Sequence, residues 1–136
     1  FRSNAHSFSK NIKISNCVHH KHGVNIVYEN LTNIYEYRKF VDANQLCVLH
    51  VMKSGCSVCY AVLPQLDDLI QQFPRVKLGV INQNKVEDIT RQLSIFTVPV
   101  DLIFFQGKEV HRQARFIDMQ RFERQLVELN DNIEYK

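Results

Sequence analysis

Two cysteines separated by two residues are the side chains of this 136-residue chain best suited to covalent chemistry. They form the motif Cys56-Ser57-Val58-Cys59, which lies between an apolar run and a segment with helical periodicity. In the first turn of a helix this spacing brings two sulfur atoms to bonding distance. The free N–H groups and the positive end of the helix dipole also stabilise a thiolate on the first cysteine. Because the thiolate is the species that attacks a disulfide, the motif favours thiol–disulfide exchange.

Zinc ligation is the main alternative chemistry for a CxxC pair. A structural zinc site usually needs a second ligand pair, and the chain has no second CxxC and no HxxxH. The other candidate ligands are His19, His20 and His22, with Cys17 nearby, but Lys21 interrupts this group. We therefore predict redox or redox-derived chemistry and no metal site, with metal ligation and an inert structural pair as the alternatives.

The other two cysteines are expected to take no part in this chemistry. Cys47 lies within an apolar run and is interpreted as a small core side chain. Cys17 lies in a polar N-terminal segment and is interpreted as an incidental exposed thiol.

The elements that must position the motif follow from hydrophobic periodicity and turn residues. The pattern predicts a strand at 25–29, a helix at 31–43 capped by Asn30, and a strand at 46–52 buried on both faces. It then predicts a helix at 57–73, with Pro64 inside it and Asp67-Asp68 on its exposed side, a strand at 76–81 and a helix at 86–93. A hairpin of strands 100–105 and 109–114 and a helix capped by Asp118 complete the chain. The order βαβαβαββα predicts an α/β fold, a central mixed β-sheet flanked by helices on both faces.

Composition and charge restrict the class of protein. The chain is 45% hydrophobic and 23% charged, which is typical of a globular domain. No run approaches the roughly 18–20 apolar residues that span a bilayer. Residues 1–25 hold four basic and no acidic residues, so the rest, with 13 basic and 14 acidic residues, is nearly neutral. This distribution argues against a nucleic-acid-binding surface on the folded part.

The first 23 residues are predicted to be a flexible leader, and 24–136 the single folded domain. The leader is polar and free of acidic residues, and it lacks the apolar core of a secretory signal. Its opening residues, 1–5, resemble the remnant of a cleaved affinity tag.

Several motifs at matching spacing make residues 24–131 resemble the thioredoxin family. An apolar strand precedes the CxxC, and Pro64 falls five residues after Cys59, where thioredoxins carry a helix proline. The segment Phe96-Thr97-Val98-Pro99-Val100 is similar to the one that holds the family's cis-proline, and residues 104–108 are similar to its hairpin. The chain is thus identified as a divergent, bacterial-type thioredoxin-like protein with a CSVC motif.

The resemblance implies a thioredoxin fold with a cis bond between Val98 and Pro99. It also implies that Val98 and Pro99 face the substrate, and that an extended peptide pairs with the Val98 backbone as an added strand. The residues around the cysteines, Gly55, Ser57 and Val58, would complete the substrate-binding surface. Here the chain departs from thioredoxin: Gly55 stands in place of a tryptophan, Ser57-Val58 in place of Gly-Pro, and Val100 in place of a threonine.

His50 and Asp101 are the polar residues that interrupt two apolar strands. His50 stands where the family has a buried acid that assists proton transfer at the second cysteine. An imidazole can accept that proton, although a core histidine held by one hydrogen bond is the alternative. A buried Asp101 needs a partner, and in the family its strand lies antiparallel to that of His50. We therefore predict a His50–Asp101 pair beneath Cys59, in which Asp101 orients the ring.

The resemblance implies a protein-disulfide reductase in which Cys56 attacks and Cys59 resolves. It implies no bound cofactor, disulfide-containing proteins as substrates, and a reductase or a low-molecular-weight thiol as electron donor. We expect a cytoplasmic monomer or weak dimer without nucleic-acid or membrane partners. The alternatives are a protein-binding adaptor module with a little-used CxxC and a zinc-binding protein.

Overall fold

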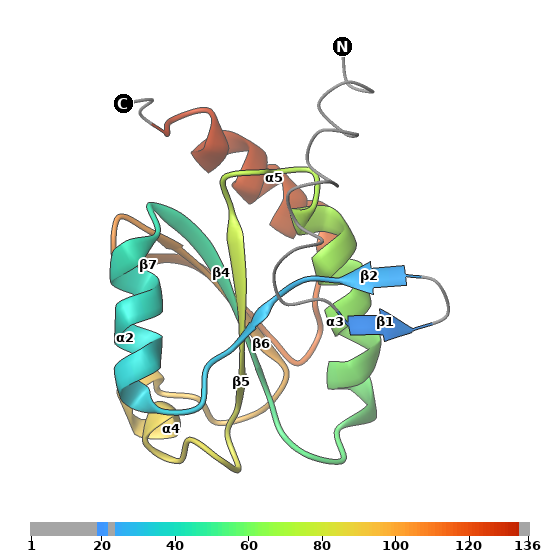
Figure 1. Cartoon of the computed structure of the whole chain (residues 1–136), viewed down its shortest axis with the longest axis vertical. Coiled ribbons are helices and arrows are strands. Elements are labelled where there is room, and N and C mark those ends of the chain that lie inside the picture. The colour runs from blue at the N-terminus through green and yellow to red at the C-terminus, as the bar shows by residue number, and fades with distance from the viewer. Residues whose placement is uncertain (1–18, 22–23, 134–136) are drawn as a thin grey trace.

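The structure, a computed structural model, describes residues 19–21 and 24–133 (Figure 1). Its elements are β1 (His19–Lys21), β2 (Val24–Ile26), β3 (Glu29–Asn30), α2 (Ile34–Ala43), β4 (Leu46–Met52), α3 (Ser57–Ile70), β5 (Lys77–Asn82), α4 (Asp88–Leu93), β6 (Val100–Phe105), β7 (Lys108–Ala114) and α5 (Met119–Asn130). None of the helices in this described part is both long and apolar enough to span a bilayer.

A five-stranded mixed sheet forms the centre, in the order β3-β5-β4-β6-β7. β3 and β4 each pair with β5 in parallel, whereas β6 pairs antiparallel with β4 and with β7. From β3 onward the element order is therefore the predicted βαβαβαββα. All seven residues of β4 are buried, as expected for the middle strand of a sheet covered on both faces.

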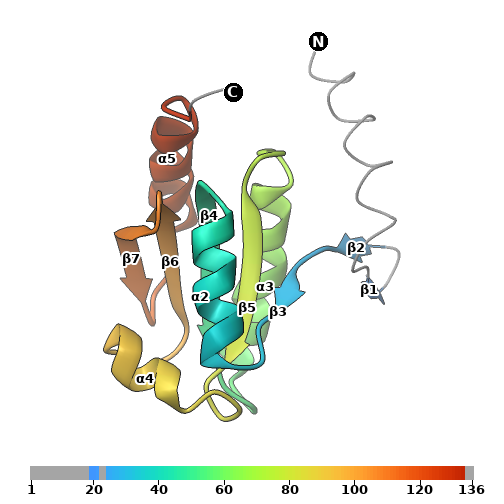
Figure 2. The ribbon, with the colours of Figure 1, turned by 60° about the vertical axis from the view of Figure 1, so that its left-hand side comes forward.

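Helices cover the two faces of the sheet separately (Figure 2). On one face, α3 and α5 pack on a cluster that includes Val48 and Ile103. On the other face, α2 and α4 pack on a cluster that includes Leu49 and Leu102. Because side chains alternate along a strand, His50 and Asp101 project toward the α3 face, the same face as Cys59.

α2 begins three residues later than predicted. The side chain of Asn33, not that of Asn30, accepts the capping hydrogen bond, from the Glu36 N–H at 2.8 Å. The Glu36 carboxylate in turn accepts from the Thr32 N–H at 2.7 Å, and this bond lowers the pKa of Glu36. Leu31 lies outside the helix, and its N–H donates to the Val80 carbonyl, so it extends the edge of the sheet.

The N-terminal hairpin of β1 and β2 crosses the predicted boundary between leader and domain. Residues 1–18, with Cys17, and 22–23 lie outside the described residues. The leader therefore remains a prediction.

The prediction for the acidic pair in α3 is half wrong. Asp68 is exposed, but Asp67 is buried and accepts hydrogen bonds from the Val27 N–H at 3.2 Å and from Gln71 Nε2 at 2.7 Å. The reason is that the chain preceding β3 runs against α3 at this point and supplies a donor that helix periodicity alone does not reveal.

Candidate active site

The CxxC motif lies where the chain turns from the end of β4 into α3. Gly55 in this turn has a φ of +80°, a conformation that side chains with a Cβ rarely adopt. Cys56 is the N-cap of α3, and its Sγ accepts a hydrogen bond from the Cys59 N–H at 3.2 Å. The first cysteine is thus placed at the positive end of a helix with a donor on its sulfur, as the spacing predicted.

The two sulfurs differ in exposure. Cys56 is half-buried and Cys59 is fully buried, while Ser57 and Val58 between them are exposed. Cys56 and Cys59 are joined as a disulfide, with their Cα atoms 5.3 Å apart. An outer sulfur that a partner can reach and an inner sulfur that only its neighbour can reach are what a two-step exchange requires.

The loop that leads into β6 lies beside this turn. Its Val98–Pro99 bond is cis, as the resemblance implied. Val100, the next residue, pairs with Val51 near the C-terminal end of β4, so the loop and the CxxC turn lie at the same end of the sheet. Val98 packs against the same cluster of apolar side chains as Cys56. The structure therefore brings the predicted substrate-facing residues to the cysteines.

The His50–Asp101 contact is present. The two residues are register partners across β4 and β6, and His50 Nδ1 lies 2.5 Å from Asp101 Oδ1. Both side chains are fully buried on the face covered by α3. His50 Nε2 has no hydrogen-bond partner within the described part of the chain. When Nδ1 donates to an ionised carboxylate, Nε2 of a neutral imidazole is an acceptor.

The third described cysteine is not part of the site. Cys47 projects to the opposite face of the sheet and is fully buried, and burial raises the pKa of its thiol to about 12. Among the described residues, no group of three or more His, Cys, Asp or Glu side chains is placed to hold a metal ion.

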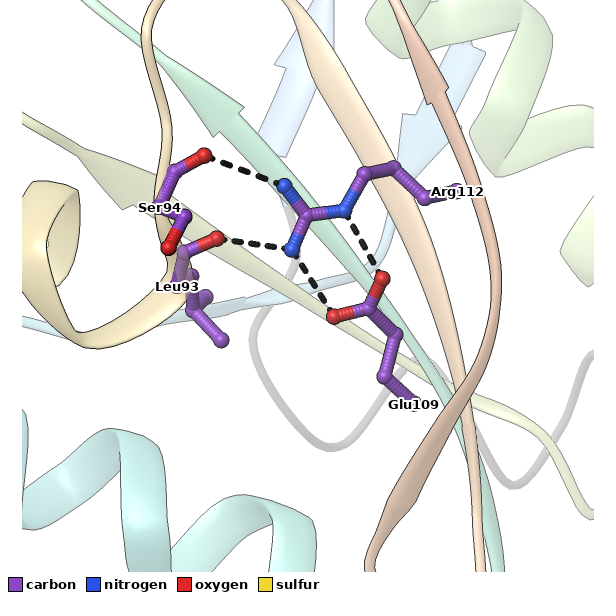
Figure 3. A network of polar contacts seen from close by, with 4 residues as sticks. All are labelled: Leu93, Ser94, Glu109 and Arg112. Carbon is purple, nitrogen blue, oxygen red and sulfur yellow. Dashed lines mark hydrogen bonds and ion pairs between the residues drawn. The ribbon is translucent and has the colours of Figure 1, made fainter.

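A polar network that the sequence does not reveal holds the start of the loop that leads to the cis-proline (Figure 3). Arg112 donates to the carbonyls of Leu93 and Ser94 at 2.7 and 3.3 Å, and Nε and Nη2 bind the two Glu109 carboxylate oxygens at 2.7 and 2.8 Å. Hydrogen bonding to Glu109 raises the pKa of Arg112. β7 is thereby tied to the end of α4, where the loop toward Pro99 begins.

A β-bulge explains why this network was missed. Residues three apart on a regular strand point to opposite faces. The register between β6 and β7 shifts between Ile103 and Phe104, so Glu109 and Arg112 come to the same side.

Comparisons with known proteins agree with the geometry. A family model described as Thioredoxin matches residues 28–128. Over 96 residues, the chain is 38% identical to the thioredoxin-like protein YdfQ of Bacillus subtilis, covering 71% of this chain and 86% of that protein. It is 28% identical over 79 residues to the mitochondrial thioredoxin-3 of Saccharomyces cerevisiae, covering 58% of this chain and 60% of that protein. The crystal structure of oxidized mitochondrial thioredoxin 3 from S. cerevisiae superposes with a TM-score of 0.67 at 22% identity, over 75% of this chain and 95% of that one.

Proposed function

The chain belongs to the thioredoxin family and is a thioredoxin-like thiol–disulfide oxidoreductase, and we propose that it reduces disulfides of protein substrates with Cys56 and Cys59. The observation that carries this proposal is the arrangement of the two sulfurs. Cys56 caps α3, is half-buried and accepts an N–H on its sulfur, while Cys59 is buried one helical turn behind it.

The reaction proceeds in two exchanges. The Cys56 thiolate attacks one sulfur of the substrate disulfide, the substrate S–S bond breaks, and one substrate thiolate leaves. Cys59 then loses its proton and attacks Cys56 Sγ, which releases the second substrate thiolate and closes the Cys56–Cys59 disulfide. Two electrons pass from the dithiol to the substrate. A reductase or a low-molecular-weight thiol restores the dithiol, for which the reducing cytoplasm is the fitting compartment.

His50 is the residue we assign to the proton of Cys59. Its Nε2 is buried, without a partner among the described residues, and lies on the sheet face that α3 covers. Asp101 holds Nδ1 and so fixes the ring and the tautomer. Cys59 is fully buried, so water has poor access to its proton and an internal acceptor is needed.

The substrate binds along the cis-proline loop. Among the described residues, no backbone hydrogen bond occupies the N–H or carbonyl of Val98, although the neighbouring Pro99 carbonyl accepts from the Arg115 N–H. An extended substrate can therefore pair with Val98 as an added strand. Gly55, Ser57 and Val58 border the same surface and leave the approach to Cys56 open.

A redox titration tests the proposal. The protein is equilibrated in dithiothreitol redox buffers, alkylated and weighed, with a Cys17→Ser variant to remove the thiol of the N-terminal segment. We expect a two-electron transition of Cys56–Cys59 in the thioredoxin region, about −270 mV. Closure only under harsh oxidation would overturn the proposal in favour of the adaptor module, and stoichiometric zinc in the purified protein would favour the metal-binding alternative.

Two serine variants separate the roles of the cysteines. Cys59→Ser is expected to trap a disulfide-containing substrate on Cys56 as a stable mixed disulfide, because the resolving thiol is gone. Cys56→Ser is expected to trap none, because the remaining thiol is buried. Equal trapping by both variants would contradict the assignment.

A further inference from the structure

The loops around the candidate active site carry a small excess of positive charge. β4 and β5 are parallel, and their C-terminal ends lie at the end of the sheet where the CxxC begins. β6 begins and β7 ends at the same end of the sheet, because Val51, Val100 and Ala114 are register neighbours. The connecting segments 53–56, 83–87, 94–99 and 115–118 contain three cations, Lys53, Lys85 and Arg115, and two acidic residues, Glu87 and Asp118, which directly precede α4 and α5.

The acidic residues in or next to these segments lie at the starts of α4 and α5. Asp118 caps α5 by accepting from the Arg121 N–H, and Asp88 pairs with Arg91 on α4. Glu87 is the N-cap residue of α4 but makes no capping bond. Lys53 and Arg115 make no ion pair within the described residues, so they are available to a partner.

Arg115 has a backbone conformation that is energetically unfavourable for a residue with a Cβ. Its φ is +67°, in the left-handed region, and its N–H donates to the Pro99 carbonyl at 2.8 Å. Glycine would adopt this conformation without the clash of a Cβ. The side chain is exposed and makes no ion pair within the described residues, so the fold gives no reason for it. Strain kept at such a place is a sign of function.

Two aromatic rings flank the same loop. Phe116 is 82% exposed, and the Arg115 guanidinium lies 5.4 Å from the centre of its ring. Phe96, three residues before Pro99, is 92% exposed. Large apolar side chains left open beside a reactive cysteine indicate a contact surface for a partner. Arginine and aromatic residues are also the types that contribute most at protein interfaces.

We propose that Lys53, Phe96, Arg115 and Phe116, here called the rim, select protein substrates whose disulfide lies in an extended, acidic segment. This inference rests on the proposed function and names the class of substrate. The arginine binds a carboxylate close to the substrate cysteine through its planar fork of N–H donors. The two rings pack against the substrate's apolar atoms, and Lys53, three residues before Cys56, attracts acidic residues of the substrate.

Matched peptides test the rim directly. One extended peptide carries a cysteine flanked by Asp and Glu, and its twin carries Asn and Gln at the same positions. Each is used as a disulfide-linked dimer, and each rate of reduction is divided by the rate with dithiothreitol to remove intrinsic reactivity. We expect the wild-type protein to reduce the acidic peptide about fivefold faster, an advantage that shrinks at high salt.

Variants of Arg115 identify the source of this advantage. Arg115→Gly is expected to bring the ratio of the two rates to about one, and Arg115→Glu to reverse it. Arg115→Gly also removes the Cβ from the left-handed position, so the melting temperature is expected to stay equal or rise. Lys108→Glu is the control, because Lys108 is exposed and begins β7 at the far end from the rim. It should leave the ratio unchanged.

The outcomes separate this inference from the proposed function. Equal reduction of both peptides by the wild type, or an unchanged ratio in Arg115→Gly, would contradict the proposed selectivity of the rim. Neither result would contradict the proposed reductase activity. An effect of Arg115→Gly on glutathione disulfide with none on the peptides overturns the assignment to a protein segment. If the wild type reduces neither peptide while dithiothreitol reduces both, the proposed function itself fails.

Discussion

The reactivity of each cysteine follows from the groups around its sulfur. The Cys56 sulfur is half-buried at a helix N-terminus and accepts an N–H, which stabilises a thiolate. Cys47 lies in β4, the strand that leads to the CxxC, but its thiol is fully buried among apolar side chains. The sequence alone predicted the positions of both, Cys56 at a helix N-terminus and Cys47 in the core, because the CxxC and the apolar run are both local signals.

Cys47 should therefore resist alkylation in the native protein. Its pKa is raised to about 12, so the reactive thiolate is scarce at every pH below that value and increases only as the pH approaches it. We expect iodoacetamide at mildly alkaline pH to modify reduced Cys56 and to leave Cys47 unmodified until the protein is unfolded in urea. Peptide mass mapping checks this result. Labelling of both residues at similar rates in the native state would contradict it.

Replacing His50 by glutamine should slow the second exchange and leave the first unchanged. A glutamine amide still donates to Asp101, but it has no nitrogen that can take up a proton. General-base assistance typically contributes at least about 100-fold, so the mixed disulfide should accumulate and resolve roughly that much more slowly. Rapid quenching followed by mass spectrometry measures both steps.

The pH profile tells this role from a merely structural one. In the wild type, hydroxide need not take part in resolution, because an internal base accepts the Cys59 proton. In His50→Gln the rate should instead rise with pH as hydroxide removes the Cys59 proton. A variant with the wild-type profile at a lower rate would indicate that His50 only supports the local packing.

At the scale of elements, apolar patterning was enough wherever a strand is fully buried. The predicted limits of 46–52 and 100–105 are those of β4 and β6, and the cap at Asp118 is confirmed. Patterning failed where a tertiary contact competes with it. Leu31 continues the helical period but is held at the sheet edge, so α2 starts at the next suitable cap, Asn33.

Arg112 is the element-scale contact whose loss should be measurable. It joins β7 to the end of α4, and it is only 29% exposed, so its bonds to Leu93 and Ser94 are partly shielded from water. We expect Arg112→Ala to lower the free energy of unfolding by about 1–2 kcal/mol. Arg112→Lys should recover little, because the three N–H groups of an ammonium diverge from one nitrogen and cannot replace a planar fork that reaches four acceptor atoms. Urea denaturation followed by circular dichroism gives both values.

Arg91 provides the comparison for this prediction. Its ion pair with Asp88 joins side chains that are 84% and 68% exposed, on a short helix. Such a surface pair contributes about 0–1 kcal/mol, so Arg91→Ala should be close to neutral. If Arg112→Ala were equally neutral, β7 would not be holding the end of α4.

At the scale of the whole molecule, the sequence predicted the fold and the centre of the site, and missed features that depend on a third element. The pairing of His50 with Asp101 followed from two polar residues in adjacent buried strands once a strand order was assumed. The burial of Asp67 depends on the chain before β3, and the bonds of Arg112 depend on a bulge and on the end of α4. Neither can be deduced from the periodicity of one segment.

The buried pair also makes a prediction about the stability of the entire fold. His50→Leu leaves the Asp101 carboxyl buried without its partner, and we expect it to lower the free energy of unfolding by about 3–5 kcal/mol. This is a large part of the roughly 5–15 kcal/mol by which a typical domain is stable. Asp101→Val leaves only a neutral imidazole without an acceptor and should cost about 1–3 kcal/mol. The double variant removes both polar groups, so its free energy of unfolding should lie within about 1.5 kcal/mol of the wild-type value. Urea titration measures all three variants.

The double variant then separates the stability of the fold from its chemistry. If the pair is kept for proton transfer, His50→Leu/Asp101→Val should fold well, close its disulfide and yet resolve mixed disulfides as slowly as His50→Gln. If the pair is kept because the sheet needs it, the double variant should be the least stable of the three. A buried polar pair that apolar residues can replace without loss of stability is retained for another reason. The pair lies on the sheet face covered by α3, the helix that carries Cys59, so the resolving step is the reason we propose.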